Sequence, residues 1–191
     1  NFSNSDPSVL NALYKITGQR PTLIEGDIRN HELMDQVFKK YPINFVIHFA
    51  ALKAVGQSLH FPLEYYSNNI AGTISLLEAM KKANVKKIVF SSSATVYGQP
   101  SQIPIKESCP VGETTNPYGQ SKVIMEKILK DLAHSHKDWS VGLLRYFNPI
   151  GAHESGLIGD DPKGEPENLA PYICQVITGE RPELSIYGND Y

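Results

Sequence analysis

Apolar residues along the chain form two kinds of pattern, short runs and stripes with helical spacing. Stripes that step by three and four residues predict helices after residue 6 and over 33–41, 63–80, 118–132 and 172–177. Short runs between them predict strands at 23–25, 45–49, 88–90, 141–147 and 184–187. Because parallel strands need crossover connections, this alternation predicts an α/β fold, a doubly wound parallel sheet with helices on both faces.

Glycine and proline place several of the boundaries. Asp6-Pro7 is typical of an N-cap followed by proline in the first turn, and Gly18 would end that helix. Pro42 ends the second predicted helix, and Pro117 begins the fourth. The stretch 149–166 is rich in glycine and proline, so we expect a linker or binding loop there.

Composition narrows the class of protein. The apolar fraction of 41% and the charged fraction of 20% are typical of a globular chain. A net charge of −2, without a run of three basic residues, argues against a nucleic-acid partner. No stretch approaches the roughly 18 consecutive apolar residues of a membrane span.

Cysteine and histidine carry little chemistry in this sequence. Cys109 and Cys174 form no C-x-x-C motif, which favours reduced thiols in a cytoplasmic protein. His134 and His136 are two residues apart, but no cysteine or second histidine pair completes a tetrahedral site. We therefore expect no metal.

The ends of the predicted strands indicate where a ligand would bind. In open parallel sheets, ligands bind beyond the carboxyl ends of the strands. These ends are Asp27, then 49–51, 91–93 and 146–148. Ser93 and Tyr118 should therefore converge on one crevice.

Tyr118 and Lys122 are one helical turn apart at the start of a helix. A phenol ordinarily ionises near pH ~10, and both the ammonium and the positive end of the helix favour the phenolate. Such a phenolate could take a proton from an alcohol while a nicotinamide takes the hydride. The spacing alone is expected roughly 0.7 times by chance, and the alternative is an exposed tyrosine beside a solvated lysine.

Several longer stretches resemble the UDP-glucose 4-epimerase family, which are extended short-chain dehydrogenases/reductases, and the match runs along the whole chain. They are Glu-Gly-Asp-Ile-Arg at 25–29, His-Phe-Ala-Ala-Leu-Lys-Ala-Val at 48–55, Ser-Ser-Ser-Ala-Thr-Val-Tyr-Gly at 91–98, Asn-Pro-Tyr-Gly-Gln-Ser-Lys at 116–122, Leu-Arg-Tyr-Phe-Asn-Pro at 144–149 with Gly-Ala-His at 151–153, and Tyr-Gly-Asn-Asp at 187–190.

The resemblance implies a Rossmann-like NAD-binding domain over 1–148, incomplete at its N-terminus, and the start of a UDP-sugar-binding region over 149–191. The first strand and its phosphate-binding turn would precede Asn1, and the rest of the uridine-diphosphate pocket would follow Tyr191. We therefore expect the isolated 191 residues to be inactive.

The reaction implied by the resemblance is reversible inversion at C4 of UDP-glucose and UDP-galactose. Tyr118 would remove the proton of the 4-hydroxyl while the C4 hydride moves to tightly held NAD, and the 4-keto sugar would turn before the hydride returns. Ser93 would bond the reacting oxygen. Lys122 would bind the nicotinamide ribose and lower the pKa of the tyrosine.

The remaining roles follow position by position from the resemblance. NAD would contact Asp27, Ile28, Phe49, Ala50, Ala51, Leu52, Lys53, Asn68, Ser91, Tyr118, Lys122, Tyr146 and Phe147. The UDP-sugar would contact Ser93, Ala94, Thr95, Tyr118, Asn148, Asn168, Leu169, Ser185, Ile186 and Tyr187. For Phe147, Leu169 and Ile186 the alternative is ordinary packing. Relatives also suggest a homodimer built from the helix over 63–80 and the helix that follows Tyr118.

Two rival functions use the same fold. Nucleotide-sugar dehydratases and decarboxylases begin with the same oxidation but need an added carboxylate, and Ala94 and Thr95 cannot supply one. A non-catalytic NAD-binding protein could lose the reactive side chains, whereas this chain retains Ser93, Tyr118 and Lys122. Both comparisons favour the epimerase.

Overall fold

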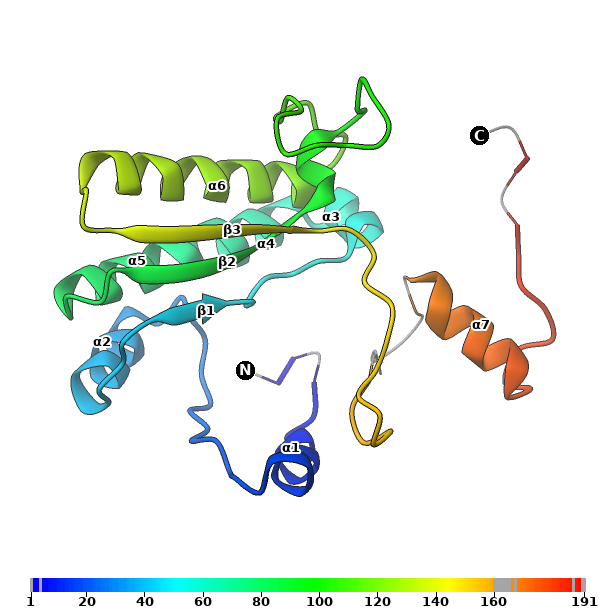
Figure 1. The fold of residues 1–191 in the computed structure, drawn as a ribbon, viewed down its shortest axis with the longest axis horizontal. Helices are drawn as coiled ribbons and strands as arrows, with labels where there is room; N and C mark the ends of the chain where they lie inside the picture. The colour runs from blue at the N-terminus through cyan, green and yellow to red at the C-terminus, as the bar shows by residue number, and fades with distance from the viewer. Residues whose placement is uncertain (1, 4, 160–165, 167, 187, 190–191) are drawn as a thin grey trace. The chain divides into compact units, whose positions relative to one another are not determined.

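The computed structural model describes residues 2–3, 5–159, 166, 168–186 and 188–189. They divide into two compact units (Figure 1). One unit spans Gly26–Phe147; the other combines Asn1–Glu25 with Asn148–Tyr191 and contains the helices α1 (Val9–Thr17) and α7 (Leu169–Ile177). The domain boundary expected after residue 148 stays a prediction.

The unit Gly26–Phe147 is built on a parallel sheet. Its strands are β1 (Val46–His48), β2 (Lys87–Ser93) and β3 (Ser140–Tyr146), in the order β1-β2-β3. Val46 lies opposite Ile88, and Ile88 lies opposite Val141. All described pairs are parallel, as the alternation of strands and helices predicted.

Helices connect these strands, and α5 and α6 run alongside β2 and β3 (Figure 1). The helical segments of this unit are α2 (His31–Lys40), α3 (Val55–His60), α4 (Pro62–Tyr66), η1 (Ser67–Ala71), α5 (Gly72–Lys82), η2 (Ala94–Tyr97) and α6 (Pro117–Ser135). The helix predicted over 63–80 is confirmed as one continuous helical run through α4, η1 and α5, which widens to a π-helical turn at η1. Such wide turns are frequent at functional sites.

The core of this unit lies between the sheet and its helices. Phe90 and Ile88 of β2 pack with Leu77 and Met80 of α5 and with Met125 and Leu129 of α6, among other residues. All six are nearly inaccessible to solvent. Alternate side chains of the strands point to the other face, where Ile47 and Leu144 are 55% and 45% exposed. Within this unit, the buried core therefore forms on one face of the sheet.

Two predicted strands are wrong. Residues 23–25 and 184–186 adopt no strand, and Leu23 and Ile24 are 45% and 39% exposed. A strand exists only where a neighbour supplies ladder hydrogen bonds, and the described residues provide none at these positions. The last residue of the second predicted strand, Tyr187, lies outside the described residues. Among the described helices, none is both long and apolar enough to cross a bilayer.

Candidate active site

The start of α6 sets the direction of Tyr118 and Lys122. Asn116 is the N-cap, and its side chain accepts a hydrogen bond from the backbone N–H of Gly119 at 2.8 Å. Pro117 follows in the first turn, where its missing N–H costs nothing. Tyr118 and Lys122 then face the end of β2 and are only 8% and 3% exposed. They are not the solvated pair that the spacing alone allowed.

Ser93, the last residue of β2, contacts the phenol of Tyr118. Its hydroxyl accepts hydrogen bonds from the backbone N–H and the hydroxyl of Thr95, at 3.2 and 3.0 Å. With those acceptor positions used, the hydroxyl proton of Ser93 is available to the phenol oxygen. Donation of this proton stabilises the phenolate, and the bond accordingly acts to lower the pKa of Tyr118.

Burial has the opposite and larger effect on Tyr118, so that the pKa of its phenol is raised above the ordinary value of 10.0. The chain by itself therefore shows no net lowering of this pKa, and the lowering effect expected of Lys122 stays a prediction. The Lys122 ammonium lies 5.7 Å from the centre of the Tyr118 ring and donates its hydrogen bond to the carbonyl of Ser91 at 2.6 Å. Loss of hydration dominates because this cation does not bond the phenol oxygen.

Burial makes the charged form of Lys122 unfavourable. Burial lowers the pKa of its ammonium from 10.5 to about 8. The Lys122 ammonium lies 4.9 Å from the centre of the Phe90 ring, and this cation–π contact offsets part of the cost of burying the charge. Burial, together with the Lys122 charge, also lowers the pKa of His48 to about 4. His48 is therefore neutral near pH 7, with Nε2 at 2.9 Å from the hydroxyl of Thr73.

The segment after β1, which was predicted to contact NAD, is held by Asn69. The side-chain oxygen of Asn69 accepts from Leu52 N at 2.8 Å, and its amide donates to Leu52 O at 3.0 Å. The same amide donates to the hydroxyl of Ser121 at 2.9 Å, and Ser121 donates to the carbonyl of Tyr118 at 2.7 Å. Asn69 thus links the segment around Leu52 to the helix that carries the tyrosine.

Sequence reasoning selected Asn68 and missed its neighbour. Asn69 is fully buried, whereas Asn68 is half-buried and donates to the side-chain oxygen of Asn69 at 3.0 Å. The available signal was a second asparagine inside the apolar stripe over 63–80. An amide at such a position needs partners, and the π-helical turn brings it to Leu52 and Ser121.

Asp27 and Ile28 lie beside η1 and α5. The carboxylate of Asp27 pairs with Arg29 through two contacts of 2.9 and 2.8 Å. Ile28 packs against Gly72, where an added Cβ would come within 2.7 Å of the Ile28 side chain. Arg29 also reaches the hydroxyl of Ser67 at 3.4 Å, so these residues adjoin the turn that contains Asn68.

Aromatic side chains gather at the carboxyl ends of the strands. The rings of Phe49 and Tyr146 are 6.2 Å apart, and those of Tyr97 and Phe147 are 6.5 Å apart. Phe49 and Phe147 are 61% and 57% exposed. Ser93 lies opposite Tyr146 in the sheet. The structure thus brings together predicted NAD-contacting residues at the carboxyl ends of β1, β2 and β3, and their contact with NAD stays a prediction.

Several predicted substrate residues belong to the other unit. Asn148 is exposed at its boundary, Asn168 is the N-cap of α7, and Leu169 is the first residue of that helix and 64% exposed. Ser185 and Ile186 are exposed outside regular structure, and Tyr187 lies outside the described residues. Their roles remain predictions.

Comparison with known proteins decides the family. Residues 2–190 match the family described as NAD dependent epimerase/dehydratase. The chain belongs to this family. Members of this family that resemble the chain include the UDP-glucose 4-epimerases of Yersinia pestis and Haemophilus influenzae, which are 54% and 56% identical to it over 191 residues.

Solved structures of this family agree. UDP-glucose 4-epimerase from Bifidobacterium longum, in complex with NAD+ and UDP, superposes with a TM-score of 0.96 at 54% identity, over 100% of this chain and 57% of that one. The protein from Stenotrophomonas maltophila, with bound NAD and formylated UDP-arabinopyranose, gives 0.95 at 46% identity over 99% of this chain and 56% of that one. The chain covers 56% of the length of the two curated relatives.

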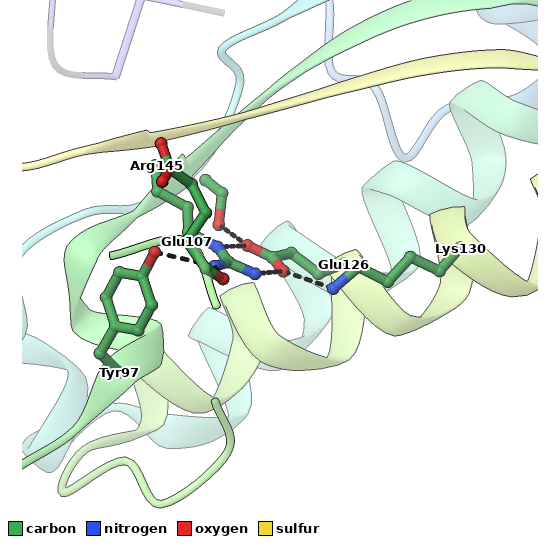
Figure 2. A network of polar contacts seen from close by, with 6 residues as sticks. Tyr97, Glu107, Glu126, Lys130 and Arg145 are labelled. Carbon is green, nitrogen blue, oxygen red and sulfur yellow. Dashed lines mark hydrogen bonds and ion pairs between the residues drawn. The ribbon is translucent and has the colours of Figure 1, made fainter. Parts of the chain in front are cut away.

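A buried charge network that was not predicted from the sequence joins α6 to β3 (Figure 2). Glu126 of α6 is 1% exposed and accepts two hydrogen bonds from Arg145 of β3, each at 2.8 Å. Lys130 and the hydroxyl of Ser92 also donate to it, at 3.0 and 2.7 Å. Burial alone would raise the pKa of Glu126, but these bonds outweigh it and lower the pKa to about 2.

The available signal for this network was an acid on the inward stripe of the helix, four residues after Lys122 and eight after Tyr118. The sequence does not identify the partner of this acid, because Arg145 is 19 residues away on another element. Arg145 also donates to the hydroxyl of Tyr97 at 2.8 Å, which extends the network to η2.

Proposed function

We propose that the full-length protein carrying this sequence is a UDP-glucose 4-epimerase that interconverts UDP-galactose and UDP-glucose through a 4-keto intermediate with tightly bound NAD. The observation that supports this most is the convergence of Ser93, Tyr118 and Lys122 at the end of β2 and the start of α6. Relatives named UDP-glucose 4-epimerase share more than half of their aligned residues with this chain.

Each of these residues has a distinct task in the proposed reaction. The Tyr118 phenolate would accept the proton of the sugar 4-hydroxyl and later return it. Ser93, oriented by its two bonds from Thr95, would donate to the reacting oxygen. Because burial raises the pKa of Tyr118, the phenolate needs this donor and the nearby cation to form at neutral pH.

The residues present fit NAD, which when bound supplies a hydride acceptor and donor. Ala50 and Ala51 follow β1 with small side chains, so a flat cofactor could approach the backbone. Asn69 fixes both backbone groups of Leu52 in this segment. Lys122, with a pKa of about 8, is mostly charged at pH 7 and would bond ribose hydroxyls. Asp27 and Ser91 lie on the same unit and would contribute further contacts.

The site chemistry favours epimerisation over dehydration or decarboxylation. Ala94 and Thr95 follow Ser93 in η2 and present no carboxylate. The nearby carboxylate of Glu126 is committed to its bonds with Arg145 and Ser92. Epimerisation needs no added acid, because the keto sugar only turns and is reduced again.

We also propose a homodimer formed through α5 and α6. An apolar groove of about 370 Å³ lies between these helices, and its lining includes Ile74, Leu77, Ile128 and Leu132. Its lining also includes the acidic and basic side chains Glu78, Lys81, Asp131 and His136. A two-fold symmetric contact would pair these opposite charges, since each groove supplies both signs.

The location and the behaviour of the isolated chain follow from the same proposal. Cys109 and Cys174 form no disulfide, which supports a cytoplasmic protein. The isolated 191 residues should have no epimerase activity, because they contain no glycine-rich phosphate-binding turn after a strand. Measurable conversion by the purified 191-residue chain would refute that expectation.

The direct test is an activity assay of the full-length protein. The protein, purified without added NAD, is incubated with UDP-galactose, and UDP-glucose is followed by chromatography. The proposal predicts conversion to an equilibrium mixture from either substrate. Loss of water or carbon dioxide from the sugar would instead support the rival enzymes, and no reaction would support a non-catalytic protein.

A further inference from the structure

Three consecutive serines at the end of β2 are each fastened to α6. The carbonyl of Ser91 accepts from Lys122 at 2.6 Å, the hydroxyl of Ser92 donates to Glu126 at 2.7 Å, and Ser93 bonds the phenol of Tyr118. Their partners are spaced four residues apart along α6, so they form one stripe on the helix. The contact between Ser93 and Tyr118 is therefore one of three neighbouring contacts that join the end of β2 to α6.

Glu126 is held more firmly than any single partner could hold it. Each carboxylate oxygen has two donors, with Ser92 and Arg145 on one oxygen and Arg145 and Lys130 on the other. Arg145 approaches from β3 with two parallel bonds, a geometry that fixes orientation as well as distance. The carboxylate therefore offers Ser92 a fixed acceptor (Figure 2).

We propose that Glu126 is a positioning residue that, through Ser92, keeps the end of β2 in register with α6 so that Ser93 meets the phenol of Tyr118. This inference rests on the proposed function of the site. Ser92 and Ser93 are adjacent in an extended strand, so a shift of one displaces the other. A well-packed apolar pair would fill the same space without loss of stability, but it would offer no directional bond.

The test uses matched substitutions in the full-length holoenzyme. Ser92→Ala removes the hydroxyl that binds Glu126, and Ser92→Cys keeps the shape of the side chain with a slightly larger and weaker donor. Ser75→Ala is the control, because Ser75 is buried to the same degree and, within the described residues, its hydroxyl alone among buried side-chain groups has no hydrogen-bond partner. For each variant, kcat, KM for UDP-galactose, the pH profile and Tm are measured.

Loss of the Ser92 bond should displace Ser93 by a fraction of an ångström. We therefore expect Ser92→Ala to lower kcat by about 10- to 100-fold while KM stays within about twofold. The acid limb of the kcat–pH profile should move to higher pH, because a looser Ser93 no longer stabilises the phenolate. Ser92→Cys should show the same split to a smaller degree. Ser75→Ala should match the parent in kcat, KM and pH profile and should raise Tm, because it removes a buried hydroxyl without a partner.

The inference is overturned if folded Ser92→Ala retains kcat within about twofold of the parent with an unshifted pH profile. It is also overturned if the losses appear only in Tm, as a merely structural bond would give. Should Ser92→Ala not fold, the same criteria apply to Ser92→Cys. An inactive parent refutes the proposed function and this inference with it, whereas an active parent with unaffected Ser92 variants refutes this inference alone.

Discussion

Lys122→Met should stabilise the folded protein while removing a residue that the proposed reaction needs. The pKa of Lys122 falls from 10.5 to about 8 on folding, which at about 1.4 kcal/mol per pKa unit corresponds to about 3 kcal/mol of lost stability at pH 7. The methionine leaves the carbonyl of Ser91 without this donor, which costs about 1 kcal/mol. The expected net gain in the free energy of unfolding is about 2 kcal/mol at neutral pH.

The pH dependence of this gain distinguishes its cause. Between pH 8 and 10.5 the unfolded chain binds more protons at Lys122 than the folded chain does, so the stability of the parent rises with pH. The cost of the buried charge shrinks to about 1 kcal/mol near pH 10, and the advantage of Lys122→Met should then be close to zero.

Urea unfolding of the NAD-depleted full-length protein, followed by circular dichroism at pH 7 and pH 10, measures both quantities. Lys127→Met is the matched control, because Lys127 lies on the same helix with a 70% exposed side chain and pairs with Asp131. Its effect on stability should be small at both values of pH. A Lys122→Met protein that is less stable than the parent at pH 7, or a difference that does not change with pH, would refute the reasoning.

Three further predictions concern stability and assembly. As pH falls from 6.5 to 4, the parent should lose about 3 kcal/mol of stability at His48, because the folded pKa of about 4 lies below the unfolded one, and His48→Gln should abolish this loss. Unfolding titrations with an unchanged pH slope would contradict this. Gly98→Ala should cost more than about 2 kcal/mol in thermal unfolding, since φ is +57° and the new Cβ would lie 1.9 Å from Glu113 O, whereas at Gly56 an added Cβ meets open space without a positive φ; equal effects of Gly98→Ala and Gly56→Ala would be contrary evidence. Leu132→Asp should convert the proposed dimer to monomer in analytical ultracentrifugation, and a dimer that persists would place the interface elsewhere.

Much of the fold was readable from the sequence, because periodicity reports which faces are buried. The parallel strands β1 to β3 and the start of α6 at Pro117 are confirmed. The strand predicted at 23–25 is wrong because two apolar residues, Leu23 and Ile24, do not specify a neighbour to pair with. The helix over 63–80 is confirmed in its stripe and its continuity, but the π-helical turn within it could not be predicted, since that turn goes with the contacts of Asn69.

Part of the candidate site was likewise predictable from the sequence, and part was not. Motif spacing was enough to select Ser93, Tyr118 and Lys122, and the structure brings them together. The pKa of Tyr118 could not be predicted, because its direction depends on how deeply the phenol is buried. The role of Glu126 could not be predicted, because its partner Arg145 is brought close only by the pairing of β3 with β2.

The central claim is that Tyr118 moves the proton of the sugar hydroxyl. The most direct measurement is kcat for conversion of UDP-galactose by full-length Tyr118→Phe beside the parent, with Tm and bound NAD verified for both. Loss of a general base predicts a fall of at least about 10²- to 10⁴-fold with NAD still bound. A folded, NAD-loaded Tyr118→Phe enzyme whose kcat stays within a few-fold of the parent would contradict the account.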